Sequence, residues 1–297
     1  MSLGWSKRER LTPYTFITPT MIALTIVFFY PMVEAFRMSL YETGLGSTVG
    51  TFVALGQYKK VVTSSYFRSI LVTSVIYTLG NVSFVWTVGL ATALMLHRPF
   101  SGRAVARAMI ILPWAIPYVA AALIWGWILD YEFGVLNYVF MQLSLITHRL
   151  NFLTACRPAL ASLTGVSIWK LFPLGTVMFL AALQTIPEEQ YSAARVDGAG
   201  PGQCFLYITL PGVRNVSIFL TLLITIWSFG RSFTVIFLLT EGGPAGCTET
   251  VVIRTYLEAF KFFHPGTAAA LGVIVLLISL TFSIAYLYFM YRAEGRP

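Results

Sequence analysis

Residues 69–96 read SILVTSVIYTLGNVSFVWTVGLATALML, a run of 28 residues without one Asp, Glu, Lys or Arg. A helix that crosses the hydrocarbon layer of a bilayer needs about 20 consecutive apolar residues, and this stretch exceeds that length. Membrane β-barrels show short segments of alternating hydrophobicity instead, and the run has no such alternation. The stretch therefore predicts a transmembrane α-helix.

The composition of the whole chain agrees with this local prediction. Of its 297 residues, 57% are hydrophobic and only 11% are charged, whereas soluble domains carry about 45–50% apolar and about 25% charged residues. So little charge cannot cover a water-facing surface of this size. The composition excludes a soluble enzyme, a disordered protein and a disulfide scaffold, and it indicates a polytopic membrane protein.

Comparable apolar stretches recur along the chain and predict six helices in all. We expect an all-α membrane domain over residues 14–291, preceded by an N-terminal segment (1–13) and followed by a short tail (292–297). No small-residue cleavage site follows the first stretch, so we expect it to be retained as a span rather than removed as a signal peptide. The expected spans are residues 14–39, 67–96, 104–129, 157–185, 213–240 and 265–291.

The distribution of basic residues predicts the orientation of these spans. An even number of spans places both termini on one side, and putting them inside leaves 10 Lys and Arg residues in inner segments against 7 in outer ones. Cytoplasmic segments carry the excess of Lys and Arg, so both termini are expected in the cytoplasm. The net charge of +8 is thereby explained by topology, and we expect no nucleic-acid partner.

The cysteines and histidines give no sign of a site. Cys156, Cys204 and Cys247 are scattered and form no CxxC pair, which favours three isolated thiols packed among apolar neighbours. The three histidines are equally far apart. We expect no metal site.

The longest inner loop, residues 187–211, reads as helix, break, helix. Pro187 suits the start of a helix, and Glu188 and Glu189 suit the positive end of its dipole. Helix-favouring residues continue to Val196. Gly198 then provides the left-handed conformation that ends helices, and a second short helix is expected before Pro211.

This loop resembles the EAA loop in permease subunits of bacterial ATP-binding-cassette importers. The matching residues are Ser192-Ala193-Ala194, Gly198 after three further residues, and Ile208 to Pro211. More narrowly, the chain resembles the carbohydrate-type permeases of maltose, trehalose and glycerol-3-phosphate systems. Shorter matching pieces follow one another along nearly the whole length: residues 16–20, 30–32, 55–58, 112–114, 133–138, 169–173 and 239–244.

The resemblance implies a fold, a location and a set of partners. The fold is the type I importer permease, in the bacterial inner membrane. A second related permease completes the pore, two ATPase subunits bind ATP and Mg²⁺, and an external binding protein delivers the sugar. This chain itself is implied to be no enzyme and to bind no cofactor.

The resemblance also implies which residues couple the permease to the ATPase. The family's opening Glu is Ser192 here, so Glu188, Glu189 or the partner permease would have to supply the acidic contact. The implied coupling residues are Glu188, Glu189, Ser192, Ala193, Ala194, Asp197, Gly198, Leu210 and Pro211.

Other classes of protein explain the sequence less well. No G-x-x-x-x-G-K-[ST] phosphate loop is present, so energy must come from another polypeptide. An ion-coupled carrier normally places Asp or Glu within the membrane, whereas the 12 acidic residues here lie in loops or at span edges. A non-transporting membrane scaffold would leave the EAA-like loop unexplained.

Two cations, Lys170 and Arg231, fall well inside predicted spans, away from the span ends. A lone charge at the bilayer centre costs at least about 2.5–3.5 kcal/mol, so each is expected to face the pore, a partner carboxylate or the outer interface. Both structural pairing and contact with an anionic or hydroxyl-rich ligand remain open. The latter reading makes an anionic sugar derivative or glycerol-3-phosphate the alternative substrate class.

The likeness to maltose-type permeases implies sugar contacts near the Trp-x-x-x-Pro stretch of the fourth span and ahead of Gly242-Gly243-Pro244 in the fifth. With the two cations and a neighbouring tryptophan, the candidate substrate path comprises Ser167, Lys170, Leu171, Leu174, Thr225, Trp227, Phe229 and Arg231.

Overall fold

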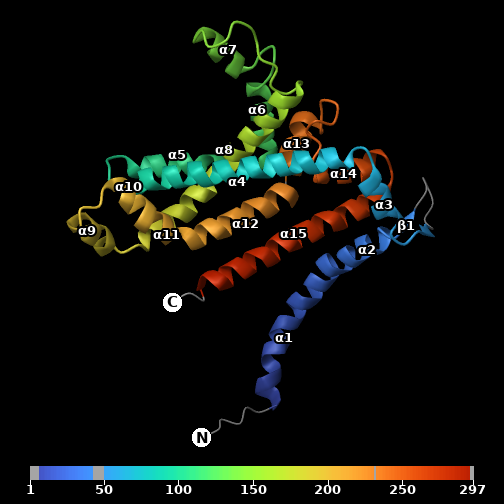
Figure 1. Cartoon of the computed structure of the whole chain (residues 1–297). Coiled ribbons are helices and arrows are strands. Elements are labelled where there is room, and N and C mark those ends of the chain that lie inside the picture. The colour runs from blue at the N-terminus through green and yellow to red at the C-terminus, as the bar shows by residue number, and fades with distance from the viewer. Residues whose placement is uncertain (1–6, 43–49, 231, 295–297) are drawn as a thin grey trace. The chain divides into compact units, whose positions relative to one another are not determined.

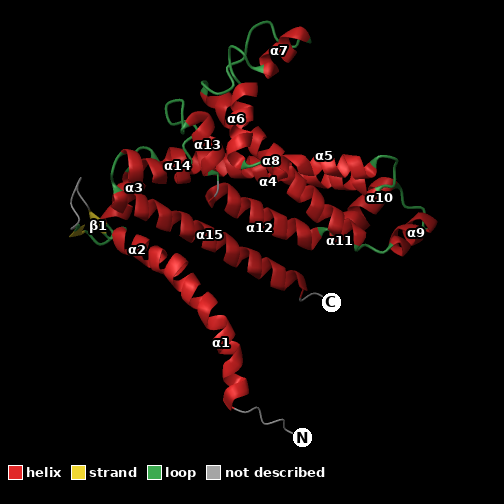
Figure 2. Cartoon of the chain, turned by 180° about the vertical axis from the view of Figure 1, so that it is seen from behind, coloured by secondary structure: helices red, strands yellow, loops and turns green. Residues whose placement is uncertain are grey.

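The computed structural model describes residues 7–42, 50–230 and 232–294, and helices dominate all three ranges. Figures 1 and 2 show the chain from opposite sides. Four described helical segments are long and apolar enough to cross a membrane, and two bent helix pairs raise the number to six if each pair is one span. The predicted helical membrane architecture is thus confirmed, with one short hairpin as the exception in the described residues.

Backbone contacts divide the chain into two compact units. The first comprises residues 1–64 and 255–274. Its hairpin pairs Tyr41 with Phe52, and Gln57 bonds both the Tyr41 carbonyl (3.3 Å) and the Thr267 hydroxyl (3.0 Å). Its elements are α1 (Lys7–Leu24), η1 (Thr25–Phe29), α2 (Tyr30–Met38), β1 (Tyr41–Glu42), β2 (Thr51–Phe52), α3 (Gly56–Thr63), η3 (Leu257–Lys261) and the start of α15 (Pro265–Glu294).

The second unit comprises residues 65–254 and 275–297 and contains the candidate site. Its amino-terminal helices are α4 (Phe67–His97), α5 (Arg103–Ala115), α6 (Tyr118–Ile128), α7 (Val135–Gln142) and α8 (Cys156–Gln184). They are followed by α9 (Glu188–Val196), α10 (Pro201–Cys204), η2 (Phe205–Thr209), α11 (Leu210–Gly212), α12 (Arg214–Gly230), α13 (Phe233–Thr240) and most of α14 (Val251–Tyr256). The rest of α15, from Val275 on, also belongs to it.

The helices α4 and α8 lie side by side and form the centre of this unit (Figure 1). A Cβ atom on Gly89 would lie 3.0 Å from the Gly175 carbonyl carbon, and one on Gly175 would lie 2.9 Å from the Val85 carbonyl oxygen. Without water in a bilayer, small residues allow helix backbones to approach closely, and polar side chains bond across the interface. Thr92 and Thr176 do so, with their hydroxyls 2.6 Å apart.

Two of the expected spans are interrupted. The third span bends by 97° between α5 and α6, where Pro117 has no N–H to continue the helix. The fifth span is divided into α12 and α13, and α12 meets the preceding helical run at 63°. The hydrophobic stretches of the third and fifth spans are present as expected, but each of these two consists of two shorter helices.

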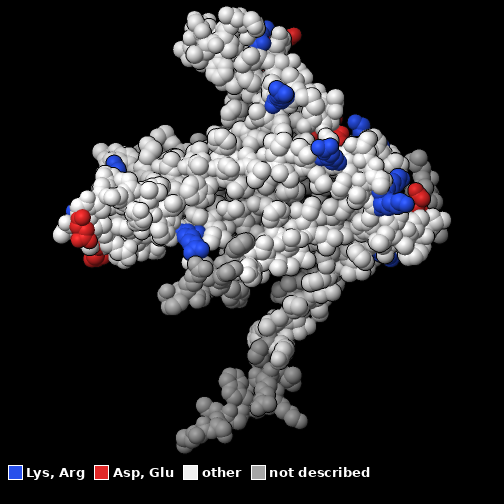
Figure 3. Space-filling view, in the orientation of Figure 1, with Lys and Arg blue, Asp and Glu red and all other residues white. Residues whose placement is uncertain are grey.

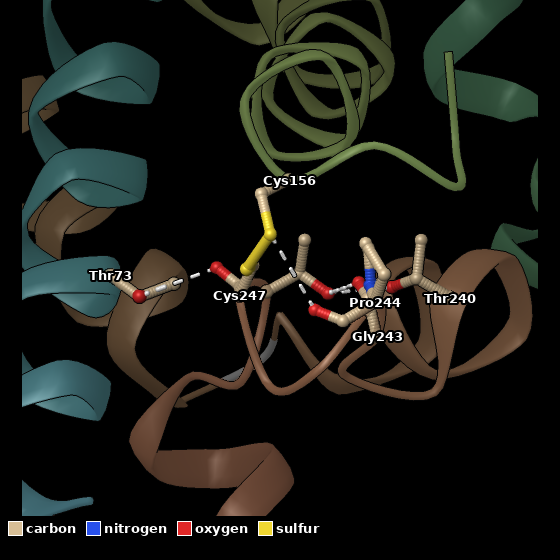
Figure 4. The surroundings of a disulfide bond; sticks show 7 residues. Thr73, Cys156, Thr240, Gly243, Pro244 and Cys247 are labelled. Atoms are coloured by element: carbon tan, nitrogen blue, oxygen red, sulfur yellow. Dashed lines mark hydrogen bonds between the residues drawn. A yellow bond between two sulfur atoms is a disulfide. The ribbon is translucent and has the colours of Figure 1, made fainter. Parts of the chain in front are cut away.

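The prediction of three isolated thiols is wrong for two of the cysteines. Cys156, at the start of α8, forms a disulfide with Cys247 in the loop after α13, across 91 residues of sequence (Figure 4). Thr73 on α4 donates to the Cys247 carbonyl at 3.5 Å. Among the three cysteines of the sequence, all of them described, Cys204 alone is free. The disulfide brings the loop after α13 to the start of α8.

Candidate functional site

The helix α9 forms where the sequence predicts it. It begins after Pro187 and ends at Val196, with Glu188 and Glu189 in its first turn, where carboxylates stabilise the positive end of the helix dipole. Arg195 lies in the last turn, near the negative end. The same Arg195 donates to the Glu188 carboxylate at 3.0 Å. Local charge placement therefore explains this short exposed helix.

Gly198 ends α9 by adopting the left-handed conformation that the sequence predicts for it. Its φ of +83° is left-handed, a conformation that glycine adopts without steric cost. The amide of Gly198 donates to the Arg195 carbonyl at 3.1 Å, and the amide of Ala199 donates to the Ala194 carbonyl at 2.8 Å. This pair of bonds is the Schellman motif, which satisfies the last carbonyls of a helix. The turn after α9 is thus fixed by its own backbone.

The return segment is tied to α9 and to the base of the loop. Residues 201–212 form a continuous helical run through α10, η2 and α11. It begins with the Gln203 carboxamide oxygen accepting from the Gly200 amide at 2.8 Å. Tyr191 on α9 bonds the Thr209 hydroxyl at 2.9 Å. A Cβ atom on Gly212 would lie 2.5 Å from the Ile186 side chain, so the two ends of the loop touch.

The outer surface of this loop combines acidic and apolar side chains. Acidic side chains gather over α9 in the space-filling view (Figure 3). Val196 is 87% exposed and Tyr207 is 78% exposed, although apolar side chains of this size usually bury most of their surface. No described residue therefore covers this partly apolar face of the loop.

The structure brings together most of the predicted coupling residues. The side chains of Glu188, Glu189, Ser192, Ala193 and Asp197 are exposed on α9 or its cap. Ala194 and Leu210 are partly buried, and Gly198 and Pro211 are exposed. Ser192, which stands in place of the family's Glu, is among the exposed residues. The assignment of all nine to coupling stays a prediction.

A groove of about 590 Å³ runs between α4, α12 and the later half of α15. Thr225 and Phe229, both predicted on the substrate path, line it. Most of the lining is apolar, but a row of hydroxyls and one cation interrupt it. These polar lining residues are Thr78, Arg214, Ser217, Thr221, Thr225 and Tyr286.

Several other predicted path residues lie elsewhere. Ser167 is buried and bonds the fully buried Tyr77 hydroxyl across the α4–α8 interface. Leu171 belongs to the hydrophobic core, and Trp227 packs against that core. Leu174 is partly buried. Neither it nor the other three lines the groove.

The two predicted intramembrane cations have different outcomes. Arg231 lies outside the described residues. Lys170 is only 2% exposed, and its ammonium group donates to the carbonyls of Pro113, Trp114 and Ile116. The Tyr118 ring centroid lies 4.9 Å from the same Nζ atom. Lys170 therefore contacts backbone at the break between α5 and α6 and does not line the groove.

The sequence analysis did not identify some residues of the loop between α8 and α12 or some residues that line the groove. Tyr191 and Thr209 carry no motif that indicates their contact across 18 residues. The polar residues that line the groove, by contrast, have a spacing in the sequence that could have identified them. Arg214, Ser217, Thr221 and Thr225 are spaced by three or four residues, which places them on one face of a helix.

The overall fold is similar to that of a solved transporter. The crystal structure of "a bacterial ABC transporter involved in the import of the acidic polysaccharide alginate" matches with a TM-score of 0.83, covering 98% of both chains at 22% sequence identity. That likeness, the helical membrane architecture and the rigid loop between two spans define the class. The chain has the fold of an importer permease of type I.

The family follows from the sequence comparison. Residues 85–294 match the family described as "Binding-protein-dependent transport system inner membrane component", and this chain belongs to it. The chain is 31% identical to the "Trehalose/maltose transport system permease protein MalF" of Thermococcus litoralis, covering 94% of both proteins. It is 30% identical to the "Sulfoquinovosyl glycerol transport system permease protein SmoG" of Agrobacterium fabrum, covering 94% of this chain and 90% of that one.

Proposed function

We propose that this chain is one of two related permease subunits of an importer that moves a sugar or sugar derivative across the inner membrane. Hydrolysis of ATP with Mg²⁺ takes place on two separate ATPase subunits, and this chain carries no catalytic residue. The observation that supports the proposal best is the loop between α8 and α12. It is rigid and exposed, and it joins directly to both spans.

The geometry supports a mechanism for coupling. The α8 helix ends at Gln184, three residues before Pro187, and α12 begins at Arg214, two residues after the return segment ends at Gly212. A displacement of the loop by the ATPase therefore displaces both helices. Because α12 lines the groove, its movement changes the width of the proposed substrate path. Binding of ATP would open the path outward, and hydrolysis would reset it.

The cysteines support the proposed orientation. Disulfides persist in oxidising compartments such as the bacterial periplasm and are rare in the cytosol. Cys156 and Cys247 are bonded at one end of α8, whereas free Cys204 lies in the loop that follows its other end. This asymmetry favours a cytoplasmic coupling loop and, with six spans, both termini in the cytoplasm. An external binding protein would then approach the side of the disulfide.

Transport in proteoliposomes tests the proposal. This chain is reconstituted with its partner permease, the ATPases and the binding protein, and uptake of labelled maltose or trehalose is measured with and without internal ATP. We expect uptake only with all components and ATP. Uphill uptake by this chain alone on a sodium or proton gradient would contradict the proposal.

A matched pair of variants tests the groove. Thr225 and Thr164 each donate a hydroxyl to the carbonyl four residues earlier, at 2.7 Å, but Thr225 alone of the two lines the groove. We expect Thr225→Val to raise the sugar concentration required for half-maximal uptake and Thr164→Val to leave it unchanged. Equal effects of the two substitutions would argue against a substrate path in the groove.

An anionic sugar derivative is the second candidate substrate. Arg214 places a cation in the lining of the groove, and the relative from Agrobacterium fabrum is named for a sulfonated glycerol glycoside. If this candidate holds, Arg214→Gln lowers uptake of a sulfonated or phosphorylated sugar while uptake of a neutral sugar is retained. A strict preference of the wild-type importer for neutral sugars would exclude it.

A further inference from the structure

Lys170 occupies an unusual position for a cation. It lies near the middle of α8, a 29-residue helix that is long and apolar enough to cross a membrane, and it is 2% exposed. An ionised side chain buried in this way requires compensation by charge or by hydrogen bonds. The compensating groups are backbone carbonyls.

The number and direction of those carbonyls match the lysine. An ammonium group has three N–H donors and no acceptor. The three acceptors are the carbonyl oxygens of Pro113 and Trp114, each 2.9 Å from Nζ, and that of Ile116. The face of the Tyr118 ring adds a cation–π contact. Every donor of the ammonium group is therefore satisfied within one small site.

The same carbonyls need a donor because α5 ends there. The last carbonyls of a helix lack intrahelical partners, and they form the negative end of the helix dipole. The Pro113 carbonyl would accept from residue 117 in a continuous helix, but Pro117 has no N–H. Within a membrane, water is not at hand to replace that donor. The charge of Lys170 and the unpaired carbonyls of the break thus compensate each other.

We propose that Lys170 is a positioning residue that fixes the 97° break between α5 and α6 to the middle of α8. The lysine acts as a C-terminal cap supplied by a different span, and it makes the bend a defined structure rather than a hinge. Because α8 leads into the coupling loop, the contact also joins that loop to α6. This last consequence depends on the proposed transport function, whereas the structural role of Lys170 does not.

A double-mutant cycle tests the structural role. Lys170→Met removes all three donors at similar length, and Pro117→Ala restores an N–H at the break. We expect Lys170→Met to lower the melting temperature of the purified protein by several degrees, and to lower it distinctly less in the Pro117→Ala background. Leu163→Met, a volume-conserving change at a fully buried position of α8, is the control and should have little effect. Equal losses in both backgrounds, or no loss from Lys170→Met, would overturn the proposal.

A distance measurement provides an independent readout. Val105 on α5 and Leu123 on α6 are 61% and 65% exposed, so spin labels can be attached to cysteines at both positions in a Cys204→Ser background. We expect one narrow distribution of distances between the two labels when residue 170 is the native lysine, and the same with Leu163→Met. With Lys170→Met we expect a broader or shifted distribution. An unchanged distribution would refute a positioning role. If Lys170→Met does not accumulate, Lys170→Gln, which retains two N–H donors, takes its place in both experiments.

The functional consequence is measured separately in the reconstituted importer. With Lys170→Met we expect sugar uptake to fall further than ATP hydrolysis stimulated by the binding protein, so that less sugar is moved per ATP. Parallel losses would refute the link between the coupling loop and α6. An importer in which even the wild type moves no sugar would instead refute the proposed function, and it would leave the cycle and the distance measurement valid.

Discussion

The Tyr191 hydroxyl lies 2.9 Å from the hydroxyl oxygen of Thr209, so α9 is bonded to the segment that returns to the membrane. Either hydroxyl can donate. Thr209 is buried at 5% exposure, so this contact lies inside the loop and is partly shielded from water. It holds the two arms of the loop between α8 and α12 together at a point distant from the turn at Gly198.

Tyr191→Phe removes this bond and is expected to loosen the loop. A hydrogen bond of this kind contributes about 0.5–1.5 kcal/mol net, so amide hydrogen exchange in α9 should accelerate several-fold, and the stimulation of ATP hydrolysis by the binding protein should fall. Tyr207→Phe is the control for the exchange measurement, because Tyr207 is 78% exposed. Unchanged exchange in Tyr191→Phe would contradict a role for the bond.

Gly198→Ala is expected to weaken the coupling loop through backbone strain. The φ of +83° at this position costs an L-residue about 1–2 kcal/mol. The control is Gly202→Ala, because Gly202 lies within α10, has no positive φ and has open space around its Cα atom. We expect coupled ATP hydrolysis to fall for the first variant only, and faster hydrogen exchange at residues 197–199. Equal activity of the two variants would show that the turn tolerates a change of conformation.

Gly175→Ala is expected to push α4 and α8 apart. Its new methyl group would lie 2.9 Å from the Val85 carbonyl oxygen, and overpacking of this kind typically costs about 1–3 kcal/mol. Gly165→Ala on the same helix meets nothing within 4 Å. The melting temperatures of the two variants in detergent should differ by several degrees, with Gly165→Ala close to wild type. A stable Gly175→Ala protein would mean that the helices separate without cost.

The disulfide makes the proposed orientation testable by labelling. In spheroplasts treated with a reductant and a maleimide, neither of which crosses the membrane, Cys156 and Cys247 should be labelled, and Cys204 should react only after lysis. In intact spheroplasts without reductant, none of the three cysteines should react. A Cys204→Ser variant separates labelling of Cys204 from labelling of Cys156 and Cys247, because only the latter two can then react. Labelling of Cys204 in intact spheroplasts would reverse the orientation.

Asn137→Ala is expected to loosen the segment around α7. The Asn137 side chain is 2% exposed. Its amide nitrogen donates to the Leu150 carbonyl at 3.0 Å, and its oxygen accepts from the Leu150 amide at 2.8 Å. Loss of such a buried partner costs about 1–3 kcal/mol.

We therefore expect faster hydrogen exchange at Leu150 and weaker stimulation by the binding protein in Asn137→Ala. Asn151→Ala, at an exposed position that bonds only Thr154 in the described structure, is the control. The segment around α7 precedes Cys156 in the chain and so leads to the disulfide, on the side that the binding protein is proposed to approach. If stimulation is normal while exchange is accelerated, this segment does not take part in that contact.

Hydrophobic length was sufficient to predict the spans that are single helices. The uncharged run from Ser69 to Leu96 lies within α4, and the boundaries of α8 agree with prediction to within a residue or two. The helix ending near Gly198 was also predictable, because its stop signal is local. These features depend on interactions between residues that are close together in the sequence, so they can be predicted from it.

Other features depend on residues that meet only after folding. The disulfide joins cysteines 91 residues apart, and no spacing rule identifies that pair. The partners of Lys170 lie more than 50 residues earlier in the chain, so the sequence left open what the cation faces. The break at Pro117 did have a signal, since the residue before a proline is disfavoured in a helix, but the uncharged run concealed it.

The bend of the third span also has a consequence for the surrounding lipid. Helices of 13 and 11 residues are about 20 and about 16 Å long at about 1.5 Å per residue. Turned by 97°, they reach only about 24 Å from end to end, less than the roughly 30 Å thickness of the hydrocarbon layer. Acyl chains beside this span must therefore compress, or protein must cover it. Compression of the lipid would make the protein sensitive to bilayer thickness.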